Sequence, residues 1–525
     1  MFLQKIKYFA KTNTCFFLLL TVLVFCLYGK SIYFGFTYHD DDILIVNNTK
    51  FLSNPKNIPA LFSASCYISD SSFYYRPILN LSFAVETLLF GTDARNYHIT
   101  NMILFIFAIF SIYLLLIKLK FNPIILKFIC ILAAAHPIFS SCAVWIPGRN
   151  DTLLAVFLCF AFINFINFIE KNNTVYLIFH CIFFTLALFT KETVLFALPV
   201  YFLFIYCFNY KISTRQIFKN IIILIPVITV YLYLRYSATA AIDYGDYFVN
   251  YKQYLLNALN GFITYISKFI TPDYIPIMLH NVKVSINAAF ITAAVFMLIL
   301  FAYTKKIISG KKICFSLLWF LFLLMPACLQ KEYVFLPHRL ITASLGIIAV
   351  ITALINYVLI KYPISKKYFI FLFLIFFPTF AYLSYIQADV YWANAYTDAP
   401  NYHLTANGLA KVYLTAGDYE QYKYFIYEAY RTSFGDRYIF DITSILIHDG
   451  NINEAEKICL NILSNPNNKP FLKFGSFWTL GNIYFNKNNF KKAYFYVKEA
   501  SKINPYDTAV SEKLKEINSI LKRQI

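Results

Sequence analysis

Long apolar runs separated by short polar segments dominate the chain from residue 15 to about residue 387. Because about 20 apolar residues in a helix cross the hydrocarbon core of a bilayer, these runs predict membrane-spanning helices. The pattern predicts an all-α fold class, a polytopic membrane helix bundle with about eleven spans. The predicted spans lie at about 15–35, 99–117, 124–143, 152–169, 174–190, 193–209, 217–235, 287–303, 313–329, 340–360 and 368–387.

The composition supports a membrane protein. The 525 residues are 59% hydrophobic and 14% charged, whereas soluble domains have about 25% charged residues. The net charge of +19 would be compatible with nucleic-acid binding, but the Lys and Arg residues lie in short loops between apolar runs, as membrane topology signals do. No basic stripe with interleaved aromatic residues lies outside the predicted spans, so we do not expect nucleic acid as a partner.

The distribution of basic residues also predicts an orientation. With the N-terminus in the cytoplasm, the short inner segments carry more Lys and Arg than the longer outer segments, which fits the positive-inside rule. This assignment treats Tyr254–Ile270 as an outer-face or re-entrant helix, because Asn257, Asn260 and Lys268 interrupt its apolar character. The first span resembles an uncleaved signal anchor. The C-terminus is then expected outside the cytoplasm.

The composition changes after the last apolar run. Residues 389–525 are polar with helical periodicity, and we expect them to form an α-solenoid of about three tetratricopeptide repeats, with weaker units near 403–435 and 436–468. Small residues at fixed spacing would let paired helices pack closely. The sharpest unit, 475–505, carries Leu480, Gly481, Tyr484, Ala493, Ala500 and Pro505 at the repeat spacing.

Charged side chains gather at the predicted outer ends of the spans. Asp40, Asp41 and Asp42 directly follow the first apolar run, and ionisable groups at a membrane boundary are costly and usually functional. The simpler alternative is a polar cap that ends the first span. The other candidates on this face are Arg76, His98, Arg149, Asp151, Lys191, Glu192 and Arg339.

Each candidate also has a local interpretation. Lys191 and Glu192 could neutralise each other at a tight turn, and Asp151 could cap the fourth span. Taken together, carboxylates and three arginines on one face of a membrane bundle suit a lipid-borne substrate that contains phosphate. Arginine binds phosphate with two hydrogen bonds, and a nearby carboxylate can accept a proton from a hydroxyl group.

No metal or other cofactor is expected. Histidines, cysteines and carboxylates do not occur at metal-ligand spacing in the sequence. The eleven cysteines are scattered singly, most of them inside apolar runs, which is typical of small buried hydrophobic side chains.

Several short motifs follow one another along the chain: Asp40-Asp41-x3-Ile45-x2-Asn48, Tyr75-Arg-Pro-Ile78, Tyr97-His-x2-Asn101, His136-Pro, Trp145-Ile-x-Gly-Arg-x-Asp151 and Lys191-Glu192. Their order resembles that in transmembrane-and-tetratricopeptide-repeat (TMTC) proteins. These belong to the C-type glycosyltransferase (GT-C) superfamily, which includes protein O-mannosyltransferases. The resemblance covers nearly the whole chain and is strongest from Tyr38 to Glu192, while Pro337-His-Arg339 departs from the family's Glu-Arg-Tyr pattern.

The resemblance implies a GT-C-like catalytic domain at 1–388, with its first outer loop at 36–98. Within this loop the sequence predicts an amphipathic segment, Pro77–Phe90, that lies along the membrane surface. Such enzymes transfer a sugar, with mannose as one candidate, from a polyprenyl-phosphate sugar to a protein or glycan on the non-cytoplasmic face. The catalytic base would be Asp40 or Asp41, and the triple Asp leaves Asp42 open. Arg76, Arg149 and Arg339 would hold the donor phosphate, and the repeat domain at 389–525 would present the acceptor.

The sequence is also compatible with two other function classes. A non-enzymatic scaffold could recruit partners through the repeats alone. A transporter fits less well, because transporters carry charges near the bilayer midplane. The chain is rich in Lys, Asn, Ile and Phe, which suggests an AT-rich genome. We therefore favour a bacterial inner membrane with periplasmic repeats. An endoplasmic reticulum protein with lumenal repeats would have a similar sequence.

Overall fold

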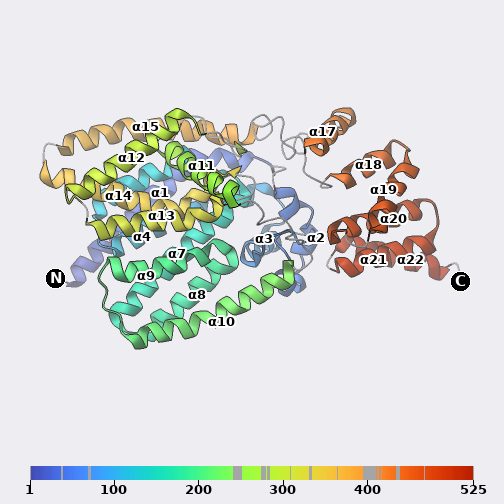
Figure 1. Ribbon diagram of the computed structural model, residues 1–525, viewed down its shortest axis with the longest axis horizontal. Helices are drawn as coiled ribbons and strands as arrows, with labels where there is room; N and C mark the ends of the chain where they lie inside the picture. Colours follow the sequence, from blue (N-terminus) through green and yellow to red (C-terminus); the bar gives the residue numbers. More distant parts are fainter. Residues whose placement is uncertain are drawn as a thin grey trace. The chain divides into compact units, whose positions relative to one another are not determined.

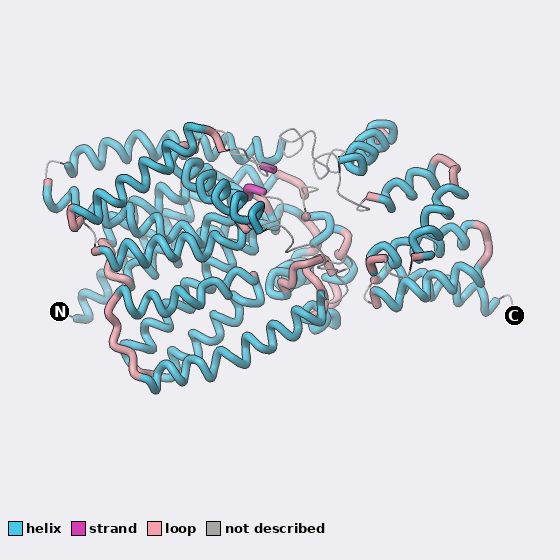
Figure 2. Tube along the Cα trace, viewed as in Figure 1, coloured by secondary structure: helices cyan, strands magenta, loops and turns pink. Residues whose placement is uncertain are grey.

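The computed structural model is almost entirely helical in its described part (Figures 1 and 2). Two short strands, β1 (Leu279–His280) and β2 (Val334–Phe335), form one antiparallel pair. The chain divides into two compact units: Met1–Thr37, Asp93–Leu232 and Tyr247–Asn394 form the first, and Tyr38–Thr92, Tyr233–Asp246 and Ala395–Ile525 the second. The structure describes residues 2–36, 40–68, 72–239, 251–272, 279–280, 284–307, 309–329, 334–362, 365–393, 410, 413–414, 417–432, 438–465, 468–505 and 507–523.

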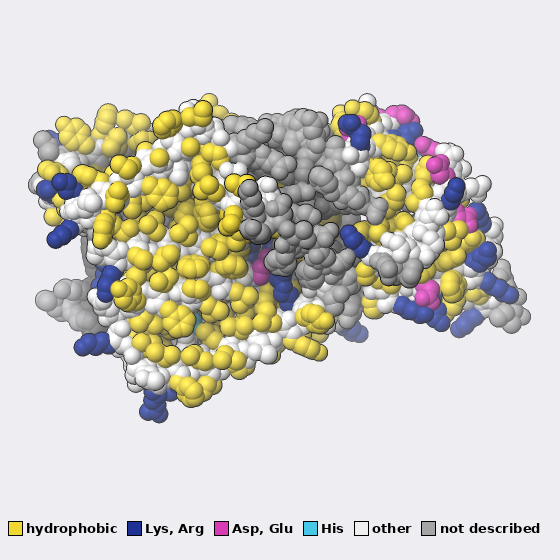
Figure 3. Space-filling view, viewed as in Figure 1, with side chains coloured by type: hydrophobic (Ala, Val, Ile, Leu, Met, Phe, Trp, Pro, Cys, Tyr) yellow, Lys and Arg dark blue, Asp and Glu magenta, His cyan; other side chains and the backbone are white. Residues whose placement is uncertain are grey.

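The first unit is a bundle of long apolar helices. Its centre is formed by α4 and α7, most of whose residues are buried, whereas few residues of α10, α12 and α15 are buried. Apolar side chains cover much of the visible surface of this bundle (Figure 3). Its helices are α1 (Phe2–Tyr28), α4 (Ala94–Lys118), α5 (Pro123–Ala134), α6 (Ser140–Val144), α7 (Arg149–Lys171), α8 (Thr174–Thr190), α9 (Leu198–Cys207), α10 (Thr214–Thr239, which ends in the second unit), α11 (Tyr251–Ile270), α12 (Ile286–Thr304), α13 (Gly310–Cys328), α14 (Leu340–Lys361) and α15 (Ser365–Ala393).

The bundle confirms a multi-pass membrane protein but contains fewer full-length spans than predicted. Eight helices among the described residues are long and apolar enough to cross a membrane, and a bent pair would be a ninth. The runs predicted at 174–190 and 193–209 form shorter apolar helices, Thr174–Thr190 and Glu192–Cys207. At about 1.5 Å per residue, α8 with its 17 residues is shorter than the ~30 Å hydrocarbon core. Among the described residues, the predicted eleven full-length spans are therefore not found.

The bent pair consists of Pro123–Ala134 and Pro137–Val144, which meet at an angle of 64°. The backbone groups exposed by this break are bonded within the protein. The Tyr28 hydroxyl donates to the Ala134 carbonyl at 3.1 Å, and the Ser384 hydroxyl donates to the Ala135 carbonyl at 2.8 Å. Because an unsatisfied backbone group in lipid costs several kcal/mol, these two hydroxyls make the break tolerable.

His136 lies at the break and has a structural role there. Its Nδ1 accepts a hydrogen bond from the Ile138 N–H at 3.2 Å and so caps the short helix η5 (Pro137–Phe139). Its Nε2 lies 2.9 Å from the Phe269 carbonyl oxygen, and the two rings stack with centroids 5.0 Å apart. The break lets the chain turn through α6 and η6 (Ile146–Gly148) into α7, whose first residues are buried.

The second unit contains the segment predicted as the first outer loop. The short helices η2 (Asp42–Val46), α2 (Thr49–Leu52), η3 (Pro55–Asn57) and η4 (Pro59–Phe62) precede α3 (Pro77–Phe90). The predicted amphipathic segment is this helix α3, which buries Leu79 and Phe83 and exposes Leu89 and Phe90. The Tyr75 hydroxyl donates to the Phe62 carbonyl at 2.7 Å and fixes the entry into α3.

The C-terminal helices also belong to the second unit. Where repeats are predicted, small residues lie at helix contacts: Ala493 and Ala500 are buried with Val497, and a side chain on Gly481 would lie 2.5 Å from Val497 Cγ2. Their identity as tetratricopeptide repeats stays a prediction, and much of the unit predicted near 403–435 lies outside the described residues. The helices are α17 (Tyr419–Thr432), α18 (Ile439–His448), α19 (Ile452–Ser464), α20 (Pro470–Asn486), α21 (Phe490–Ile503) and α22 (Thr508–Arg523).

The close approach of α13 and α14 requires glycine at position 346. A Cβ atom there would collide with the Ser316 carbonyl oxygen of α13. We expect Gly346→Ala to destabilise the first unit by about 1–3 kcal/mol, because overpacking forces backbone shifts. Thermal unfolding of the detergent-purified protein measures this loss. Gly29→Ala is the matched control, because nothing lies within 4 Å of a Cβ at that position. Equal melting temperatures for the two variants would contradict the prediction.

Candidate active site

A buried ion pair joins α7 and the end of α8. Asp151 lies in the first turn of α7, and Lys191 directly follows α8. The Lys191 ammonium donates to Asp151 Oδ1 at 2.8 Å and to Oδ2 at 2.7 Å. Their residues are only 2% and 6% exposed. Buried charges persist in a folded protein when they are paired in this way, so the pair fixes the α7–α8 hairpin at this end.

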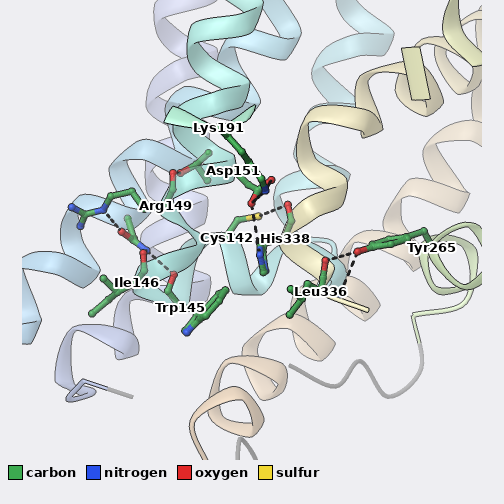
Figure 4. Close-up of polar contacts among 11 residues, drawn as sticks. Cys142, Trp145, Ile146, Arg149, Asp151, Lys191, Tyr265, Leu336 and His338 are labelled. Atoms are coloured by element: carbon green, nitrogen blue, oxygen red, sulfur yellow. Dashed lines mark hydrogen bonds and ion pairs between the residues drawn. The ribbon is translucent and has the colours of Figure 1, made fainter. Parts of the chain in front are cut away.

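His338 approaches the same carboxylate from another part of the chain (Figure 4). It lies in η8 (Pro337–Arg339), and its Nε2 is 3.7 Å from Asp151 Oδ2. Its ring packs against Trp145 with centroids 4.8 Å apart, and its carbonyl oxygen lies 3.8 Å from the donating Sγ of Cys142. The Asp151 carboxylate of α7 thus has neighbours from the end of α8 and from η8.

Arg149 is held by the Tyr97–Asn101 motif of α4. Its Nε donates to Asn101 Oδ1 at 2.8 Å, and its Nη2 donates to the Tyr97 carbonyl at 3.1 Å. The Asn101 amide in turn donates to the Trp145 carbonyl at 2.8 Å and to the Ile146 carbonyl at 3.1 Å. Two of the motifs recognised in the sequence therefore bind each other, and Asn101 is the central connector.

The remaining candidates of the first unit lie nearby along the chain. His98 Nε2 is 3.2 Å from the Gly35 carbonyl oxygen, so His98 holds the segment after the first span. Glu192 begins η7 (Glu192–Ala197) and is half-buried, as is Arg339 at the end of η8. Beside η8, the Tyr265 hydroxyl donates to the Leu336 carbonyl at 2.8 Å and accepts from the Leu336 N–H at 3.2 Å.

Asp40, Asp41, Asp42 and Arg76 belong to the second unit. Asp40 is half-buried with a left-handed backbone at φ 68°, and the Tyr67 hydroxyl donates to its Oδ1 at 3.4 Å. Asp41 and Asp42 are buried where the π-helical turn η2 begins. Arg76 immediately precedes α3, and its guanidinium lies 4.2 Å from the centroid of the Tyr74 ring.

The structure therefore brings together only part of the predicted set. Within the first unit, Asp151 and Lys191 form a buried ion pair, whereas the buried Arg149 binds Asn101 and the Tyr97 carbonyl. The sequence analysis assigned no role to His338, although it directly precedes the predicted Arg339. It also assigned none to Asn101, the last residue of the Tyr97-His-x2-Asn101 motif. In the described part of the chain, no group of three or more His, Cys, Asp and Glu could hold a metal ion. The absence of a metal requirement stays a prediction.

Comparisons with known proteins support the resemblance seen in the motifs. A family model for dolichyl-phosphate-mannose-protein mannosyltransferase matches residues 77–236. Protein O-mannosyl-transferase TMTC3 of Homo sapiens is 26% identical over 162 residues, which are 30% of this chain and 17% of that protein. Protein O-mannosyl-transferase TMTC1 of Mus musculus is 30% identical over 147 residues, which are 27% of this chain and 16% of that protein.

The chain thus spans about a sixth of the length of the relatives that it matches. No solved structure matches. The chain is similar to the TMTC mannosyltransferases, as predicted, and the family match includes Arg149, Asp151 and Lys191.

The buried pair makes a prediction about stability. Lys191→Met leaves the Asp151 carboxylate buried beside an apolar side chain and should cost about 3–5 kcal/mol. Adding Asp151→Asn should restore much of this loss, because the unpaired charge is then gone. The measurement is thermal unfolding in detergent. Lys502→Met, which removes an exposed i,i+3 ion pair with Glu499, is the control and should change stability by less than about 1 kcal/mol. A double variant that is as unstable as Lys191→Met would refute this account.

Proposed function

We propose that this protein is a membrane glycosyltransferase of the GT-C type. It would transfer a sugar, with mannose first among the candidates, from a polyprenyl-phosphate sugar to a hydroxyl group of a protein or glycan on the non-cytoplasmic face. The observation that carries the proposal is the buried Asp151–Lys191 ion pair, with Arg149 buried two residues from Asp151. All three lie in a multi-pass helix bundle, within the region that matches the mannosyltransferase family.

The charges of this group suit the donor. Arg149 and Lys191 are cationic and Asp151 is anionic, and all three are nearly inaccessible to water. Buried cations of this kind stabilise an anionic group such as a phosphodiester. Lys191 would bind a phosphate as a point charge, in exchange for its bond to Asp151. Arg149 is anchored to α4 and would act mainly through its charge. Arg339 and Arg76 are further candidates for the phosphate.

The chemistry is a single displacement. The oxygen of the acceptor hydroxyl forms a bond to the anomeric carbon, and the bond from that carbon to the phosphate oxygen breaks. Its electron pair leaves with the polyprenyl phosphate, and a carboxylate accepts the hydroxyl proton. Cations lower the energy of the departing phosphate, and exclusion of water prevents hydrolysis of the donor. Attack in line with the leaving group inverts the anomeric configuration.

Asp40 or Asp41 would be the general base, with Asp42 as a third possibility. This assignment comes from the resemblance, and the local geometry of Asp40 adds support. Asp40 is the half-buried member of the three, whereas Asp41 and Asp42 are buried. Its backbone has a positive φ, a conformation that Asp tolerates but that is uncommon away from turns and functional sites.

The partners and the location follow from the same reasoning. The C-terminal helices would form a repeat domain that presents the acceptor. The N-terminus would lie in the cytoplasm, and the bundle would most simply lie in a bacterial inner membrane. The competing proposal is a non-enzymatic scaffold that binds partners through the same helices.

The test is sugar transfer in membranes that contain the full chain, supplied with polyprenyl-phosphate mannose and other polyprenyl-phosphate sugars. Mass spectrometry of the acceptors gives the readout. We expect Asp40→Asn or Asp41→Asn to reduce transfer by about 10²–10⁴-fold, the usual contribution of a general base. Asp93→Asn is the matched control, because Asp93 is an exposed cap of α4 and Asn caps helices equally well.

The outcomes separate the proposals. Retained transfer in an Asp40→Asn, Asp41→Asn double variant would exclude both residues as the base. Retention of anomeric configuration in the product would exclude a single displacement. Absence of transfer by the wild type with every donor would favour the scaffold.

A further inference from the structure

Two side chains of different chemistry approach one oxygen of Asp151. Lys191 Nζ lies 2.7 Å from Asp151 Oδ2, and His338 Nε2 lies 3.7 Å from the same atom. The lysine forms a full hydrogen bond, whereas the histidine is roughly 0.5–1 Å beyond one. All three residues are more than nine-tenths buried. The carboxylate thus has one bonded donor and a second that is close enough to replace it after a small movement.

The position of His338 is fixed by contacts other than the one to Asp151. Its carbonyl oxygen lies near the donating Cys142 Sγ, and its ring packs against Trp145. Two residues earlier, Leu336 is bound through both backbone groups by the Tyr265 hydroxyl. These contacts hold η8 in place, so the imidazole can close the remaining gap to Asp151 by rotating its side chain.

The ion pair limits what Lys191 can do in the proposed reaction. If the ammonium turned from Asp151 to a phosphate, the carboxylate would remain buried without its bonded donor, which is energetically costly. Lys191 can therefore bind an anion strongly only when another donor satisfies Asp151. His338 can supply an N–H from Nε2.

We propose that His338 is a positioning residue for the donor phosphate: it takes over the hydrogen bond to Asp151 when Lys191 turns to the phosphate of a polyprenyl-phosphate sugar. This inference rests on the proposed function. The exchange requires no covalent step, since one hydrogen bond to Asp151 replaces another. His338 does not touch the reacting atoms and acts through Asp151 and Lys191.

Two substitutions separate this role from simple packing. His338→Gln retains a side-chain N–H donor but loses the ring, whereas His338→Phe retains a ring against Trp145 but loses the donor. We expect His338→Phe to weaken binding of a short-chain polyprenyl phosphate by about tenfold or more, the scale of a hydrogen bond to a charged group. His338→Gln should bind within about threefold of the wild type. Binding is measured by titration of the detergent-purified full chain.

We expect the kinetic constants to rank the variants in the same order as the binding affinities. With polyprenyl-phosphate mannose as donor, His338→Phe should raise the donor KM far more than it lowers kcat, and His338→Gln should restore most of the KM. If His338→Phe does not fold, His338→Leu replaces it, because leucine also lacks a donor. Loss in His338→Gln with retention in His338→Phe would mean that ring packing matters and would overturn the inference. Equal binding by all variants would also overturn it.

Failure of the inference and failure of the proposed function can be distinguished. Wild-type transfer with equal phosphate binding by all variants leaves the function intact and overturns the role of His338. Phosphate binding without transfer of any sugar overturns the function, while the order of the variants still decides the role of His338. A wild type that does not bind polyprenyl phosphate overturns the inference directly.

Discussion

The first unit depends on the cost of placing charge away from water. Arg149 and Asp151 lie two residues apart at the start of α7, and both are almost completely buried. Each requires partners that the helix itself cannot supply. Asn101 and the Tyr97 carbonyl bind the guanidinium, and Lys191 binds the carboxylate. These bonds fix α4 and the end of α8 against α7, in a membrane bundle where apolar contacts alone give little orientation.

The broken span makes this arrangement possible. A continuous helix through residues 123–144 would carry the chain straight across the bundle. The turn at Ala135 and His136 instead leads through α6 to Trp145 and on to the buried start of α7. Non-helical backbone is tolerated at membrane depth only when the protein satisfies its polar groups. Tyr28, Ser384 and Ile138 form hydrogen bonds with the groups around the turn. The buried start of α7 thus depends on the break between α5 and α6.

Local features of the fold could be predicted from the sequence, and long-range contacts could not. Segment Pro77–Phe90 was predicted with the bounds that α3 has, because its proline start and its apolar pattern are encoded within the segment. The run at 174–190 was likewise predicted with the bounds of α8, and its 17 residues already fall short of the ~20 that cross the hydrocarbon core. The motif residues Asn101 and Arg149 were noted without any sign that they bind each other. Asp151 and His338 are far apart in sequence, and no spacing rule relates them.

The hydrogen bonds at the broken span also constrain the order in which the protein can be completed. The Ala135 carbonyl is bonded by Ser384, which is 249 residues later in the chain. During synthesis the N-terminal part emerges first, so α5 and α6 enter the membrane well before α15 exists. Until α15 is inserted, the Ala135 carbonyl lacks its native donor and must accept a hydrogen bond from water or from a temporary partner. Helix α15 therefore completes a turn that forms early in the chain. In a chain truncated before α15, the Ala135 carbonyl would lack the Ser384 donor and would need water at this turn.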